Sequence, residues 1–330
     1  MLLVLELDVA DLAATRFAIS PLSETTRAML LLGRPSPPAV NLPWVRWARA
    51  ELARRPLRLP RAWPLIVNGL PFYPEFLNPA PTVREPEIGD ELARVRATAA
   101  GPVRASLRRV FGDHPWPDSA VSLFERPAES LAEIAAELAE CHDRLVRPHW
   151  ERIRPVLEAD IAYRAGLLAD GGARSLFSDL HPDLRWSGGT LTLTDTDEGP
   201  ARFKVVLGPD GVVLLPSVFN WPTVSVSKRT STQTALLYPA RGAATVWEDS
   251  VTAASSAVEE LLGPARARLL GALRSPATTS ALASNFGVTP SAVSQHLAVL
   301  HRRAWSTGSV SAAGCCTKPP SWGWPCSTRP

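Results

Sequence analysis

A dense run of prolines limits what the first quarter of this chain can fold into. Eleven prolines lie between residues 34 and 85. Because each proline removes a backbone donor and obstructs the preceding helical turn, this stretch predicts short helical pieces joined by turns. Six aromatic residues here should pack a core, with a ligand pocket as the alternative: Trp44, Trp47, Trp63, Phe72, Tyr73 and Phe76.

The flanking segments have a helical hydrophobic period. Residues 1–33 predict a short strand and then a helix, which Ser20 and Pro21 would open as cap and first residue. Apolar residues recur at helical spacing over 86–112 and 127–177, where Gly171-Gly172 interrupts the pattern near its end. Residues 1–180 should therefore be mainly helical.

From residue 186 the hydrophobic period becomes two, as in strands. The Asp210-Gly211 pair stands between two apolar runs and predicts a hairpin turn, since glycine adopts positive φ without strain. We expect a small antiparallel sheet over 186–248. The fold class is then α+β, with a body at 1–250 that senses a ligand or mediates dimerisation.

The distribution of charge and cysteine indicates the kind of partner and the compartment of the protein. Residues 251–330 carry seven Lys or Arg against two Glu, whereas the net charge of residues 1–250 is −2. A basic C-terminal end fits contact with a polyanion. Three of the four cysteines lie in the last 16 residues, so there is no disulfide framework. No apolar run approaches the roughly 20 residues of a membrane span, and we expect a cytoplasmic protein.

The segment Thr278–Arg303 has the pattern of two helices joined by a glycine turn. Residues 280–286 predict a short helix, and Gly287 suits the left-handed turn that follows it. Thr289 can cap a second helix whose first residue is Pro290. This arrangement is that of a helix-turn-helix, and we assign residues 251–303 to a DNA-binding domain.

The second helix, residues 290–302, separates into two faces at about 100° per residue. Val293, Leu297 and Leu300 fall together and predict a buried stripe. The opposite face carries residue types that address base edges and phosphates of double-stranded DNA. The candidate DNA-binding residues are Thr289, Ser291, Ser294, Gln295, His296 and Arg302, with His296 divided between phosphate contact and packing.

Residues 263–300, and above all the run Val-Ser-Gln-His-Leu-Ala-Val-Leu at 293–300, resemble the DNA-binding half of ArsR-type winged-helix transcriptional regulators. The body, with Phe219-Asn-Trp-Pro, is similar to the long N-terminal extension of an actinobacterial subgroup of such regulators. The resemblance implies binding to double-stranded DNA. We expect a homodimer, because paired recognition helices then address two half-sites about one turn apart, and an unknown small-molecule effector is a possible partner. Metal-sensing members carry a Cys-x-Cys pair on a helix, which this chain lacks, so we expect no metal and no other cofactor.

The family's wing, a strand pair after the recognition helix, has no counterpart in the composition of residues 304–330. This stretch contains no Leu, Ile, Phe, Asp or Glu, and we expect an irregular tail. Arg outnumbers Lys 32 to 3, which indicates GC-rich coding. A GC-rich back-translation, read from the third base of each codon, gives LVDRLGVGRRVLYQATELGLALLDA, which has the pattern of a wing. We therefore expect a frameshift, with a genuine tail as the alternative.

Other chemical groupings are weak. Asp179, His181 and Asp183 alternate, but Pro182 favours a turn over a metal site. His142, Asp143 and His149 lie near one another in the sequence, but Pro148 divides them and no further metal ligand is evident. No phosphate loop, zinc-protease motif or serine elbow is present, so we expect no enzyme. The alternative is a small-molecule-binding or catalytic cytoplasmic protein that has lost DNA binding.

Overall fold

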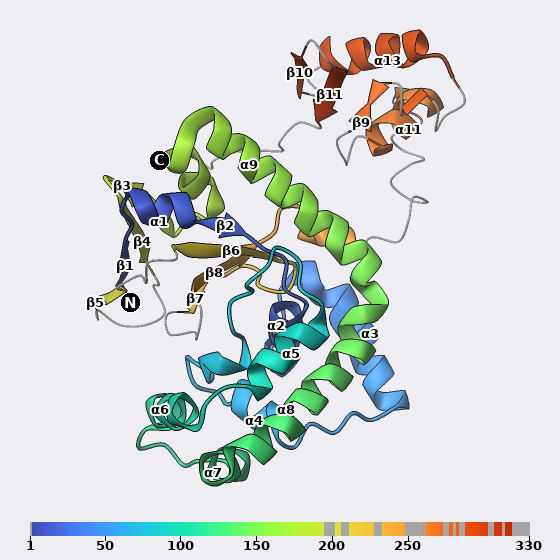
Figure 1. Ribbon diagram of the computed structural model, residues 1–330. Coiled ribbons are helices and arrows are strands. Elements are labelled where there is room, and N and C mark those ends of the chain that lie inside the picture. The colour runs from blue at the N-terminus through green and yellow to red at the C-terminus, as the bar shows by residue number, and fades with distance from the viewer. Residues whose placement is uncertain are drawn as a thin grey trace, which may run out of the picture. The chain divides into compact units, whose positions relative to one another are not determined.

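The computed structural model describes residues 2–194, 202–205, 211–227, 233–247, 260, 262–272, 277–279, 282–283, 288–302, 307–311 and 314–318. The chain divides into two compact units, Met1–Glu248 and Asp249–Pro330. Each unit is described by itself below (Figure 1).

The first unit, the body, is mainly helical. Its helices are α1 (Val9–Ala14), α2 (Pro21–Gly33), α3 (Leu42–Arg54), α4 (Ala62–Ile66), α5 (Ile88–Arg96), α6 (Ala100–Phe111), α7 (Asp118–Glu125), α8 (Pro127–Cys141) and α9 (Trp150–Leu180). Short 3-10 turns lie at Ala39–Asn41, Glu75–Leu77, Arg147–His149 and Ala243–Trp247, and a π-helical turn at His142–Val146. The proline-rich stretch forms short helices, as predicted. α2 begins as predicted too, with Ser20 Oγ accepting from Ser23 N at 2.9 Å.

Two four-stranded sheets complete the body, and both are mixed rather than antiparallel. Their strands are β1 (Leu2–Glu6), β2 (Arg16–Phe17), β3 (Leu184–Ser187), β4 (Thr190–Thr194), β5 (Arg202–Val205), β6 (Val212–Ser217), β7 (Ser225–Ser227) and β8 (Thr234–Pro239). The orders are β3-β4-β1-β5 and β2-β6-β8-β7. β5 pairs parallel to β1, and β6 pairs parallel to both β2 and β8. The prediction of one antiparallel sheet over 186–248 is therefore right for the pairs β3–β4 and β7–β8, wrong for the parallel pair β6–β8 and for the division into two sheets, and it omits two N-terminal strands.

The hairpin predicted at Asp210-Gly211 is also wrong. β5 and β6, which flank this pair, belong to different sheets. Gly211 does have positive φ, at 66°, but for another reason. A Cβ on Gly211 would lie 2.4 Å from the carbonyl oxygen of Asp11, so the glycine allows the chain to pass close to α1.

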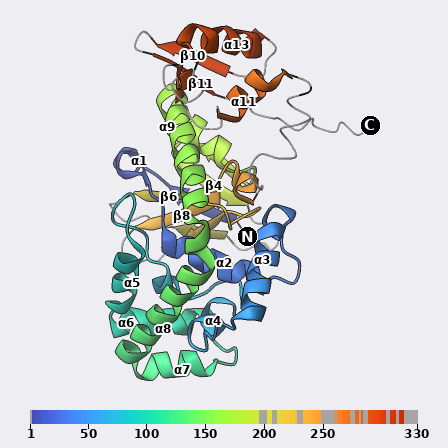
Figure 2. The same ribbon diagram turned by 90° about the vertical axis from the view of Figure 1, so that its right-hand side faces the viewer.

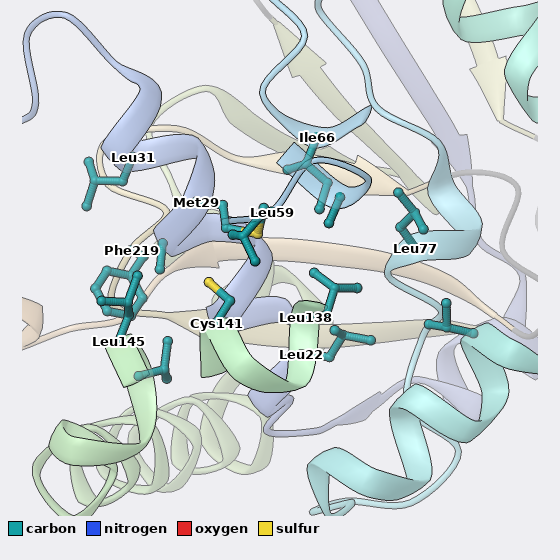
Figure 3. Packing of buried hydrophobic residues seen from close by; sticks show 14 of the residues in the cluster. Leu22, Met29, Leu31, Leu59, Ile66, Leu77, Leu138, Cys141, Leu145 and Phe219 are labelled. Atoms are coloured by element: carbon teal, nitrogen blue, oxygen red, sulfur yellow. The ribbon is translucent and has the colours of Figure 1, made fainter. Parts of the chain in front are cut away.

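A large apolar cluster forms the core of the helical part. Figure 3 shows its centre, where Met29 of α2, Leu138 and Cys141 of α8, and Leu59 pack together. Of the six aromatic residues noted in the sequence, Trp44 and Phe76 are buried in this core. Trp47, Trp63 and Tyr73 pack against it half-buried, whereas Phe72 is exposed.

α9 links the helical part of the body to the sheets (Figure 1). Its helical φ and ψ are broken at Gly172 (φ 65°, ψ −166°), which confirms the predicted interruption. Asp160 anchors the helix, because its carboxylate accepts hydrogen bonds from Arg164, from Tyr238 Oη at 2.8 Å and from Arg241 N at 3.0 Å. Burial of this acid is thereby compensated.

The described part of the second unit includes two helices and a three-stranded sheet. The helices are α11 (Pro264–Ala272) and α13 (Pro290–Arg302), and the strands are β9 (Ala277–Thr278), β10 (Thr307–Ser311) and β11 (Gly314–Lys318), in the order β10-β11-β9. Figure 1 labels all five elements, and Figure 2 shows α11, α13, β10 and β11 from a second side. The expectation of a wholly irregular tail is therefore corrected: residues 307–318 include an antiparallel strand pair. Ladder hydrogen bonds come from the backbone, so this pairing does not need the apolar residues that the tail lacks.

Candidate nucleic-acid interface

The N-terminus of α13 is built as the sequence predicts. Pro290 is the first helical residue, where its missing N–H costs nothing. Thr289 Oγ1 accepts a hydrogen bond from Ala292 N at 3.2 Å, and Thr289 O accepts one from Val293 N at 3.2 Å. This cap fixes the direction of the helix and satisfies one of its free donors.

One face of α13 is buried in a small core of the second unit. Val293, Leu297 and Leu300 are 0%, 6% and 1% exposed, which confirms the predicted stripe. They pack with Leu269 of α11 and with the helical residues Leu282 and Ala283. Because both neighbouring segments bury apolar residues against α13, the orientation of its outer face is fixed by packing.

The outer face of α13 is polar and exposed. Ser291, Ser294 and Gln295 are exposed, as is Thr289 just before the helix. His296 is half-buried at the edge of the face. Arg302 is the last helical residue. The predicted residues therefore lie on one helix and its cap, with four of them on the solvent side.

Ala298 also belongs to this face and was missed in the sequence. It is exposed and lies seven residues after Ser291, about two helical turns on. The same rotation of about 100° per residue would have placed it there. A small apolar side chain at such a position suits contact with a thymine methyl group.

The charged side chains of the C-terminal 70 residues are all basic. Residues 261–330 contain seven Lys or Arg and no Asp or Glu. The N-terminus of α13 adds the positive end of a helix dipole beside Ser291. Both contributions favour a polyanion, and the residue types on the exposed face suit base edges rather than a metal.

Most of the predicted helix 280–286 and the glycine turn at Gly287 lie outside the described residues, which include only Leu282 and Ala283 of that helix. The described segment after them, Val288, donates from its N–H to Ala283 O at 3.1 Å. That bond ties the start of α13 to the preceding helical residues.

The weaker groupings in the body have structural contacts. His181 Nε2 lies 2.6 Å from Pro222 O, and its Nδ1 accepts from Asp183 N at 3.2 Å, as in a turn. His142 Nδ1 lies 3.0 Å from Thr25 Oγ1, and burial lowers the pKa of His142 to about 4. His149 packs edge-on against Trp47. No three potential ligands gather around a metal site in the described part of the chain.

Comparison with known proteins supports a helix-turn-helix in the second unit. Residues 261–304 match a helix-turn-helix domain of the ArsR/SmtB kind. Residues 89–244 match a family of unknown function, DUF5937. No curated protein and no solved structure matches the chain. Among the described helices, none has the length and apolarity of a bilayer span. The chain thus joins a body of unassigned role to a DNA-binding type of domain.

Proposed function

We propose that this protein is a DNA-binding transcriptional regulator of the ArsR type. The match to a helix-turn-helix domain at residues 261–304 carries the proposal. The burial of one face of α13 and the exposure of Ser291, Ser294 and Gln295 on the other support it. The resemblance of the body to the extension of actinobacterial regulators points the same way. The protein acts in the cytoplasm without a catalytic step of its own.

In this proposal α13 lies in the major groove of double-stranded DNA. Gln295 and the serines address base edges, whereas Thr289, His296 and Arg302 contact phosphates. The protein binds as a homodimer, because two recognition helices then reach half-sites about one helical turn apart. The body responds to an effector or holds the dimer together.

The test is a fluorescence-anisotropy titration of the full chain against DNA from upstream of its own gene, at several salt concentrations. A regulator should lose affinity as salt rises, because binding releases counterions. Gln295→Ala should weaken binding to the specific site by about 1–3 kcal/mol and leave random DNA nearly unchanged. Arg302→Ala is the matched comparison, since loss of a phosphate contact should weaken both DNAs alike.

Two outcomes would overturn the proposal or part of it. Absence of salt-dependent binding to any DNA would favour the alternative, a body that binds small molecules in a protein that has lost DNA binding. Equal losses on both DNAs for Gln295→Ala would refute base readout by that residue. If the protein sediments as a monomer both alone and bound to DNA, the dimer is refuted.

A further inference from the structure

The helical part of the body contains a pocket of about 450 Å³. It lies between the end of α2, α3, the segment before α4, and the end of α8. The residues that line it include Leu52, Leu57, Arg58, Trp63, Cys141 and Leu145. This volume lies within the range of about 300–1,000 Å³ that small-molecule sites in proteins occupy.

Hydrogen bonds hold the wall of the pocket at both ends. At one end, the Glu137 carboxylate of α8 accepts from Arg61 N at 3.0 Å and from Ala62 N at 2.8 Å, which fixes the start of α4. At the other end, the Arg144 guanidinium donates to the carbonyl oxygens of Arg55 and Pro56. The segment between these points, which supplies Leu57 to Pro60, is therefore pre-organised.

The floor of the pocket coincides with an irregular helix. α8 passes at Cys141 into the π-helical turn His142–Val146, whose Leu145 also lines the pocket. Such turns are rare and are frequently found at functional sites. Figure 3 shows Cys141 and Leu145 inside the apolar cluster, with Leu59 close to Cys141. The Trp44 indole N–H donates to Leu145 O at 3.1 Å and holds the turn in this shape.

The polarity of the lining defines the ligand. Nine of the ten lining residues are apolar or, in Cys141, a thiol whose pKa burial raises to about 12, so the thiol is neutral. Arg58 alone brings a charge, and its exposed guanidinium forms no ion pair with any described residue. No carboxylate lines the pocket. The site thus combines an apolar interior with one unneutralised cation.

We propose that this pocket binds an apolar small molecule with a single anionic group, its hydrocarbon part against Leu52, Leu57 and Trp63 and its anion at Arg58. Burial of hydrocarbon supplies the affinity, and the guanidinium fixes the orientation of the ligand. The proposal that the body binds this ligand depends only on the residues of the pocket and not on DNA binding. The further statement that the ligand changes DNA affinity rests on the proposed function.

The binding test uses the full chain without DNA, with decanoate and decanol as probes and the fluorescence of the tryptophans or calorimetry as readout. Wild type should bind decanoate saturably at one site per chain. Arg58→Ala should weaken decanoate about fivefold, as expected for a solvent-exposed ion pair, and leave decanol unchanged. Arg49→Ala, an exposed arginine of α3 outside the lining, is the matched control.

A second pair of variants tests the interior. Leu52→Trp adds volume at the half-buried wall of the pocket and should weaken binding of both probes, whereas Leu52→Met keeps the volume of the side chain and should retain binding. Absence of saturable binding of either probe by wild type would overturn the proposal. So would equal affinity of decanoate for wild type and Arg58→Ala. The effect of decanoate on DNA affinity is then measured separately, so a protein that binds decanoate but not DNA would refute only the regulatory role.

Discussion

Glu24 is a carboxylic acid in the core of the body. It is 1% exposed; Oε2 accepts a hydrogen bond from Val218 N at 3.1 Å, and Oε1 has no hydrogen-bond partner in the described part of the chain. Burial raises the pKa of Glu24 from 4.5 to about 7, because desolvation outweighs the hydrogen bonds and the nearby Arg27. Between these two values the folded chain holds a proton that the unfolded chain releases.

Stability should therefore fall as pH rises through this window, and Glu24→Gln should reduce that fall. The amide has no charge to bury, so the Tm of the variant should vary less between about pH 5 and 7 than the Tm of wild type. His142, whose lowered pKa acts in the opposite direction, is present in both proteins and cancels in the difference. Thermal unfolding at a series of pH values measures the effect.

Glu91 provides the comparison for this experiment. Burial raises its pKa to about 7 as well, but both of its oxygens accept hydrogen bonds, from Ser20 Oγ at 2.6 Å and Leu22 N at 2.8 Å. Glu91→Gln replaces one of these acceptors with a donor and should lower Tm at every pH. An identical pH profile for Glu24→Gln and wild type would contradict the titration of Glu24.

Leu297 tests the orientation of α13 at the level of one residue. It is 6% exposed within the small core of the second unit, so Leu297→Asp places a charge among apolar side chains. The variant should lose the fold of that unit and its DNA binding, while the body keeps its own unfolding transition. Ala298→Asp, one residue further on the exposed face, is the matched control and should stay folded by circular dichroism. Unchanged helicity in the Leu297→Asp variant would refute the face assignment.

Residue burial was predictable in α13 but not in α2, for a physical reason. In α13 polar and apolar residues separate at the helical period, so the period alone identifies Val293 and Leu297. In α2 the buried side includes Glu24 and Thr25, whose burial depends on partners far along the chain, such as Val218. A polar residue with a distant partner leaves no signal in the local pattern.

At the scale of elements, Gly172 sets the path of α9. Its φ of 65° and ψ of −166° lie in a region that is almost confined to glycine. A Cβ there would meet no atom within 4 Å, so any effect of a side chain comes from the backbone conformation. Gly172→Ala should destabilise the body by about 1–3 kcal/mol in urea unfolding.

A second glycine separates backbone strain from loss of flexibility. Gly101, in α6, also has nothing within 4 Å of an added Cβ, but it has helical φ. Gly101→Ala should leave the stability unchanged or raise it by up to about 1 kcal/mol. Equal changes in free energy for the two variants would contradict the assignment of strain to Gly172.

Strand pairing was the element-level property that the sequence could not predict. The period of two located β4 and β8, because alternation and apolar runs are local. The pairings β3–β4, β6–β8 and β7–β8 join strands close in sequence, but β1 joins β4 and β5 from the other end of the chain, and β2 joins β6. Antiparallel pairing is the default expectation for strands close in sequence. Here the N-terminal strand β1 lies between β4 and β5, and β2 lies beside β6, so neither β4–β5 nor β5–β6 pairs.

At the scale of the whole molecule, positive charge is concentrated in the second unit. Residues 261–330 are free of carboxylate side chains, whereas the body is net acidic. In the proposed function, this separation directs DNA to one unit and leaves the pocket of the other to a different ligand. The division into two units around residues 248–249 fits such a separation of tasks.

The frameshift hypothesis concerns the tail after α13, which we expect to be read out of frame from about residue 304. In the structure, Thr307–Ser311 (β10) and Gly314–Lys318 (β11) form an antiparallel pair. In the shifted reading, the Gly-Arg-Arg segment falls at positions 311–313 and the Val-Leu-Tyr segment at positions 314–316. The Val-Leu-Tyr segment thus coincides with β11, and the two arginines fall in the sequence between the two paired strands. Apolar residues in these strands would add buried area that Ser, Thr and Gly do not supply.

We therefore predict that shifting the frame by one nucleotide at codon 304 raises both stability and DNA affinity. The shifted tail adds two arginines between the paired strands, where they can contact phosphates, so the dependence of affinity on salt should steepen. The two proteins are compared by thermal unfolding and by anisotropy on the same DNA, and the control is a chain that ends after Arg303. If the unshifted tail binds DNA as tightly as the shifted one, or if resequencing finds stop codons in the shifted frame, the tail is genuine and the hypothesis fails.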